Sequence, residues 1–145
     1  MSKLKIMNMR TLVLGSVLSL CSVSANAELV VIVNPSNATA SLSTEQVAAL
    51  YLGNATTFPD GGGVALADQS ESANARNDFY QKATGRSAAQ VKATWARITF
   101  TGKGTPPKEL KSDADVKAFV ASNPKAIGYI DSSAVDSSVK VALKL

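Results

Sequence analysis

The run Leu29 to Val33 (LVVIV) constrains the fold more than any other part of the sequence. It is continuous, apolar and mostly β-branched. A strand with one solvent-facing side alternates apolar and polar residues, whereas an unbroken apolar run is typical of a strand that is buried on both faces. The sequence therefore predicts a mixed or parallel sheet that is covered by helices.

Three helices are predicted from capping boxes, each followed by apolar residues at helical spacing. In such a box a serine begins the helix, and a polar side chain lies three residues later, so that the two satisfy free N–H groups of the first turn. The boxes are Ser43–Gln46, Ser87–Gln90 and Ser112–Asp115. A fourth helix, ending at Gly85, is predicted from the shared face of Ala75, Phe79 and Ala83.

Further strands are predicted over 64–67, 126–130 and 139–143. No internal repeat, low-complexity tract or linker divides the chain, which predicts a single small α/β domain. Three aromatic residues, Tyr51, Phe79 and Trp95, are expected in its core. Gly128, inside a predicted strand, is expected to let another backbone or side chain approach closely.

The first 27 residues are typical of an export signal. Basic Lys3, Lys5 and Arg10 precede an apolar stretch over 11–20, and Ala25-Asn26-Ala27 supplies the small residues that a signal peptidase accepts. The apolar stretch is shorter than the roughly 20 residues that a membrane-spanning helix needs. We therefore expect cleavage after Ala27, a domain over 28–145 and a periplasmic location.

The only cysteine, Cys21, lies within this signal, and the sequence contains no histidine. Leu20 precedes Cys21, where a lipoprotein signal would have a small residue. Residues 28–145 can form no disulfide and lack the usual catalytic base, thiol nucleophile and structural zinc ligands. Asp113 and Asp115 are two residues apart on a helix and face apart, so we expect them to complement its N-terminus rather than act as an acid–base pair. The sequence predicts neither an enzyme nor a bound metal or cofactor.

The charge balance gives no sign of a nucleic-acid partner. The chain has 15 basic and 11 acidic side chains, but three of the basic ones lie in the predicted signal. The remaining domain is nearly neutral and its basic residues are scattered, whereas nucleic-acid-binding domains concentrate them on one face.

Three segments in chain order carry a family pattern: LVVIVNPSN at 29–37, STEQVAALYLGNATTFPDG at 43–61 and NPKAIGYI at 123–130. Together they resemble the phosphate-type substrate-binding proteins of ABC importers. The resemblance implies the type II periplasmic binding protein fold, in which two α/β lobes hold an anion in the cleft between them. Because domains of this kind have about 100–150 residues each, the chain is expected to form one lobe.

The same resemblance implies where a ligand would bind. The family has Ser-Gly-Thr-Arg at the start of a helix, with an aromatic residue three positions after the arginine. Aligning Arg76 and Phe79 with that motif puts Ala73-Asn74-Ala75 in place of Ser-Gly-Thr, so both hydroxyls are lost.

Two serines just upstream of the motif could replace these hydroxyls. The resemblance thus implies an oxyanion held by Ser70, Ser72, Asn74 and Arg76, together with helix N–H groups. The alternative is that Ser72 caps the helix and that Arg76 is an exposed partner of Glu71 or Asp78.

Other candidate ligand residues lie elsewhere in the sequence. Asn34, Ser36 and Asn37 follow a buried strand, where open α/β sheets place ligand groups, although turn chemistry alone would also explain them. Arg97 and Lys103 are further basic candidates, and the loop of Lys103 lacks the spacing of a P-loop.

Two functions therefore remain open. The first is the binding of phosphate or a related small oxyanion for uptake or sensing, with a membrane permease or a signalling protein as partner. The second is a protein-interaction module, in which the former lobe–lobe face meets a partner or a second copy of the chain.

Overall fold

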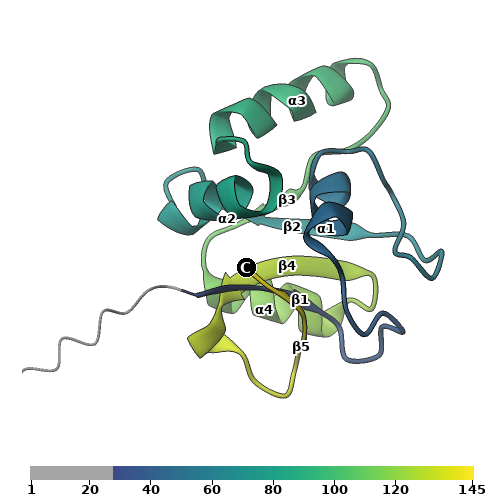
Figure 1. Ribbon diagram of the computed structural model, residues 1–145, viewed down its shortest axis with the longest axis vertical. Helices are drawn as coiled ribbons and strands as arrows, with labels where there is room; N and C mark the ends of the chain where they lie inside the picture. The colour runs from purple at the N-terminus through teal and green to yellow at the C-terminus, as the bar shows by residue number, and fades with distance from the viewer. Residues whose placement is uncertain (1–27) are drawn as a thin grey trace, which may run out of the picture.

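The computed structural model describes residues 28–145, which form one mixed sheet with helices on both faces (Figure 1). The predicted signal over 1–27 and its cleavage site lie outside the described residues. In chain order the elements are β1 (Leu29–Val33), α1 (Thr44–Tyr51), β2 (Ala65–Gln69), α2 (Asn74–Thr84), α3 (Ala88–Phe100), β3 (Lys108–Leu110), α4 (Asp113–Ser122), β4 (Ala126–Asp131), a 3-10 turn at Ser132–Ala134, and β5 (Lys140–Lys144).

The strand order is β3-β2-β4-β1-β5. Strand β2 runs parallel to β3 and β4, whereas β1 runs antiparallel to both of its neighbours, β4 and β5. All five residues of β1 are buried, which confirms the prediction from their continuous apolar run. The single α/β domain with a mixed sheet is therefore confirmed.

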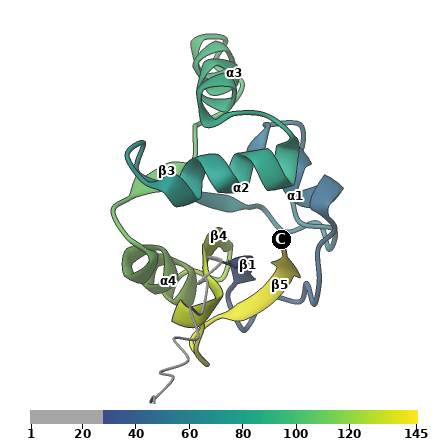
Figure 2. The same cartoon turned by 60° about the vertical axis from the view of Figure 1, so that its left-hand side comes forward.

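The helices form two unequal layers around the sheet. Helices α1 and α2 cover one face, α4 covers the other, and α3 packs on α2 at the greatest distance from the sheet (Figures 1 and 2). The larger apolar cluster lies beneath α1 and α2 and contains all three aromatic residues predicted for the core, Tyr51, Phe79 and Trp95. No helix over 28–145 has the length and apolar character needed to cross a bilayer.

The helix starts follow the predicted caps, with one difference. Complete capping boxes form at Ser43 and Ser87, where glutamine side chains return the second hydrogen bond. At the third box the Ser112 hydroxyl accepts from the Asp115 N–H, but no reciprocal bond to the Ser112 N–H forms.

The sheet differs from the predicted strands in two respects. Strand β3 was not predicted, because its three residues, KEL, lack an apolar pattern and are largely exposed. Strand β2 continues past the predicted end at Ala67 through Asp68 and Gln69, which are polar and yet buried. These two polar residues become central to the candidate site.

Gly128 in β4 allows α4 to pack directly on the sheet. A Cβ atom built on Gly128 would lie 2.5 Å from Val116 Cγ1 and 3.3 Å from Val120 Cγ2. We expect Gly128→Ala to lower the free energy of unfolding by about 1–3 kcal/mol, because an overpacked core must shift backbone or side chains. Urea denaturation would measure this loss. Gly63→Ala is the matched control, since its Cβ would meet nothing within 4 Å; an equal loss in both variants would contradict the packing argument.

Candidate functional site

The seven candidate ligand residues fall at opposite ends of the sheet. Because β1 is antiparallel to β4, its last residue, Val33, pairs with Ile127 near the start of β4. Strand β2 is parallel to β4 and also begins there, with Leu66 beside Ile127. Asn34, Ser36 and Asn37 therefore lie where β2 begins, whereas Ser70, Ser72, Asn74 and Arg76 follow its end. The structure does not bring the two groups together.

In the first group, the side chains of Asn34 and Asn37 form hydrogen bonds with backbone groups. The Asn34 amide donates to the carbonyls of Val120 and Ala121 at 3.0 and 2.9 Å, and so caps the end of α4. Its carbonyl oxygen accepts from the Ser36 N–H and hydroxyl, and the Asn37 side chain accepts from the Thr39 N–H at 2.8 Å. These contacts fit turn chemistry, one of the two interpretations that the sequence allowed, with the addition of a helix cap.

The second group surrounds the start of α2. Ala73 occupies the N-cap position and makes no side-chain bond, so Ser72 does not cap the helix. The hydroxyls of Ser70 and Ser72 lie 3.2 Å apart in the loop, and Asn74 is exposed. The first N–H groups of a helix generally have no acceptor within the helix. Here the Arg76 N–H donates to the Ala73 carbonyl at 3.1 Å, so it is not free.

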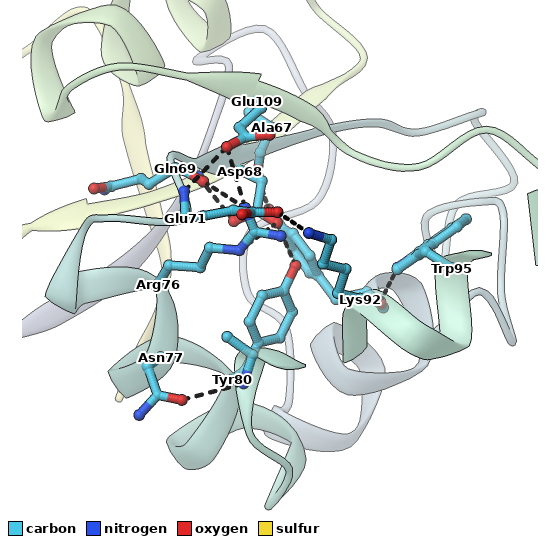
Figure 3. Close-up of polar contacts among 12 residues, drawn as sticks. Ala67, Asp68, Gln69, Glu71, Arg76, Asn77, Tyr80, Lys92, Trp95 and Glu109 are labelled. Carbon is cyan, nitrogen blue, oxygen red and sulfur yellow. Dashed lines mark hydrogen bonds and ion pairs between the residues drawn. The ribbon is translucent and has the colours of Figure 1, made fainter. Parts of the chain in front are cut away.

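Arg76 is buried rather than exposed, and its partners are not those expected. It is 9% exposed; its Nη1 donates to the Gln69 carbonyl at 3.1 Å, and its Nε lies 3.7 Å from Asp68 Oδ2 (Figure 3). No hydrogen-bond acceptor satisfies the buried Nε among the described residues. Pairing with Glu71 or Asp78 is thus replaced by pairing with Asp68, because the side chain folds back beneath the loop.

Asp68 is a buried carboxylate held by groups from three elements. Oδ1 accepts from the Tyr129 hydroxyl and from the Gln69 N–H, and Oδ2 accepts from the Tyr80 hydroxyl at 2.5 Å. A buried carboxylate is tolerated only when it is paired and hydrogen-bonded, and here both conditions are met. Burial first, and then the negative charge of Asp68, raise the pKa values of Tyr80 and Tyr129 far above the ordinary value.

Glu109 in β3 is a second carboxylate beside the arginine. Its Oε1 accepts from the Glu71 N–H at 3.0 Å and lies 3.4 Å from Arg76 Nη1 (Figure 3). The Glu109 side chain is 51% exposed. Glu71 itself pairs with Lys92 of α3, an exposed contact that joins α3 to the loop.

A cavity of about 490 Å³ opens beside these groups, between α2, α3 and the segment that precedes β3. Arg76, Asp68 and Tyr80 line its polar part. The remaining lining is mostly apolar and includes Trp95 and Phe100, and Phe100 is 93% exposed.

The two other basic candidates lie away from this cavity. Arg97 borders an open groove with Arg86, and Lys103 lines a separate small cavity of about 200 Å³ beside Gly53. Sequence reasoning missed Asp68 and Glu109. In the sequence, only the polar residues at the end of the β2 run could have indicated that Asp68 belongs to the site. Nothing in the short β3 indicated the same for Glu109.

The buried tyrosines make the fold sensitive to alkaline pH. Burial and then Asp68 also raise the pKa of Tyr51, so all three tyrosines of the chain have raised values in the folded state. The unfolded chain releases these protons near pH 10 (about the ordinary tyrosine pKa), so their contribution to stability is complete below that pH and is lost as pH rises above it.

We therefore expect tyrosinate absorbance to appear in one cooperative step that coincides with the loss of near-ultraviolet circular dichroism. Phenolate absorbance with a midpoint near 10, in a protein that keeps its native dichroism, would contradict this account of the cluster.

Comparison with solved structures identifies the fold. No protein-family model matches the sequence, and comparison with curated proteins gives no significant relative. A protein from Clostridium perfringens, assigned as a phosphate ABC transporter substrate-binding protein and solved with bound phosphate, matches with a TM-score of 0.65 at 19% identity. An ABC-type phosphate transport receptor from Vibrio cholerae matches with a TM-score of 0.55 at 23% identity.

Both matches cover 79% of this chain but 44% of the other protein, so this chain spans less than half the length of the proteins that it resembles. PstS from Borrelia burgdorferi gives a similar result, with a TM-score of 0.54, 12% identity and coverage of 79% and 46%. The expected resemblance is thus confirmed: the chain has the fold of about one lobe of the phosphate ABC transporter substrate-binding proteins.

Proposed function

We propose that this chain is a periplasmic binding module that holds a phosphate-like oxyanion at the start of α2, for uptake or sensing. Residues 1–27 would direct export and be removed after Ala27. The module binds rather than catalyses, and delivers its ligand or its signal through a permease or a signalling protein. The fold shared with phosphate-binding transport proteins and the residues at the start of α2 support this proposal.

The contact made by Glu109 is the observation that carries the proposal. Its carboxylate is itself an oxyanion, and it sits between the Glu71 N–H and the Arg76 guanidinium. The chain thus puts one of its own carboxylates against Arg76, the residue that the resemblance assigns to ligand binding. Since the side chain is half exposed and long, it can swing into solvent when an external anion takes its place.

Further donors lie in the same loop and at the helix that follows it. The Ser70 and Ser72 hydroxyls lie in the loop, and α2 presents its first N–H groups with no capping side chain. Hydrogen bonds from such groups to a charged acceptor are stronger than those between neutral groups, and the positive end of the helix dipole adds to them. A single lobe leaves one side of the anion in water, so we expect modest affinity.

A second function is favoured by one observation, the 93% exposure of Phe100 at the rim of the largely apolar cavity. In an interaction module this face would be covered by a partner protein or by a second copy. Analytical ultracentrifugation distinguishes a second copy from a different partner protein. If the chain self-associates, its measured mass should rise with protein concentration, and the Phe100→Ser variant should have a lower mass than the wild type at the same concentration.

Removing the competing carboxylate tests the oxyanion site. We expect calorimetry at low ionic strength to show saturable phosphate binding, and Glu109→Gln to tighten it about fivefold to tenfold, since the internal anion no longer competes. Arg76→Lys should weaken binding, because lysine keeps a charge for Asp68 but lacks the guanidinium fork.

Glu45→Gln is the matched control for Glu109→Gln. It removes the same charge from an exposed position in the first turn of α1 and should leave binding unchanged. The proposal fails if folded Glu109→Gln protein gives no binding heat with phosphate or with a carboxylate at millimolar concentration.

A further inference from the structure

We infer that the ligand is an organic monoanion, in which one acidic group is attached to an apolar body of about the size of an aromatic ring. The inference rests on the proposed oxyanion site and names the class of molecule that would bind there. Its basis is the cavity that continues from Arg76 toward Trp95 and Phe100.

The size of the cavity exceeds what an inorganic oxyanion needs. Its volume of about 490 Å³ lies within the range of roughly 300–1,000 Å³ that is usual for pockets of organic ligands. An inorganic phosphate at Arg76 has only five heavy atoms and would leave most of this space to water. A ligand with an apolar body would fill it.

The walls of the cavity fit such a body. Six of the lining residues are apolar: Val91, Trp95, Ala96, Phe100, Pro106 and Pro107. The Trp95 indole N–H is already bound to the Tyr51 carbonyl at 2.7 Å, so the indole offers the cavity only ring surface. Phe100 is exposed, and an apolar ligand would remove part of its ring from water, which is favourable.

The charges around the cavity favour a single negative charge on the ligand. Asp68 is saturated by two tyrosine hydroxyls and a backbone N–H, and it balances Arg76. Glu71 and Lys92 neutralise each other. Of the carboxylates that line the cavity, Glu109 is therefore the one that an incoming anion can displace from Arg76.

A monoanion that replaces Glu109 preserves the charge of the site. A dianion such as hydrogen phosphate would place an additional negative charge near the buried Asp68, where like charges repel strongly. The apolar lining and the charge balance thus point to the same ligand, a carboxylate or another singly charged acid with an aromatic or branched body.

Ligand binding can be measured by the fluorescence of Trp95, because it is the only tryptophan in the chain and it lines the cavity. We expect phenylacetate to change its fluorescence and to bind at least about tenfold more tightly than acetate or, at pH 8, inorganic phosphate. Phe100→Ala should weaken phenylacetate binding about fivefold and leave acetate binding unchanged. Arg97→Ala is the matched control, since Arg97 is exposed on the same helix but lies outside the cavity.

The outcomes separate the two proposals. If phosphate binds as tightly as phenylacetate, the inference about the organic body is overturned while the oxyanion site stands. If benzyl alcohol binds as tightly as phenylacetate, the acidic group is not recognised and the inference also fails. If no anion binds to the wild type or to Glu109→Gln, the proposed function fails with it.

Discussion

The buried carboxylate of Asp68 is the interaction on which the rest of the structure depends. It is contacted by a tyrosine and the arginine of α2 and by a tyrosine of β4, so one side chain near the end of β2 joins that strand to both elements. A lone charge at this depth would destabilise the fold, whereas the hydroxyls and the guanidinium make it a cross-link. Tyr129, which donates to Asp68, stacks on Phe79 with ring centroids 3.9 Å apart, and Asp68 itself is 3% exposed.

The same cross-link positions the candidate site. Asp68 lies against the Nε of the buried Arg76, and the same guanidinium contacts Glu109 through Nη1 and lines the cavity. The arginine is therefore held in place rather than being a mobile surface charge, and Asp68 balances its charge in the absence of a ligand. Under the proposed function, the acidic residues around the site would influence which anions bind as much as Arg76 does.

Features encoded locally were predictable from the sequence, and those that join distant segments were not. The run 29–33 and the capping boxes at Ser43 and Ser87 depend on neighbouring residues, and the structure confirms them. The direction of a strand within a sheet cannot be deduced from its own residues. The sequence therefore did not indicate that Asn34 would bond to the end of α4 rather than lie near the ligand loop. Glu109 was not predicted either, because β3, the strand that carries it, is defined by its pairing with the distant strand β2.

The order of strands also bears on when the chain can fold. Strand β1 comes first in the described chain, yet both of its neighbours, β4 and β5, come last, and the Leu145 N–H closes on the Leu29 carbonyl. The most buried strand therefore has no partner until nearly the whole polypeptide is present, and such long-range pairing is slow. The sheet of such a chain can be completed only after the last strand has been synthesised, so its folding has to wait for the C-terminus.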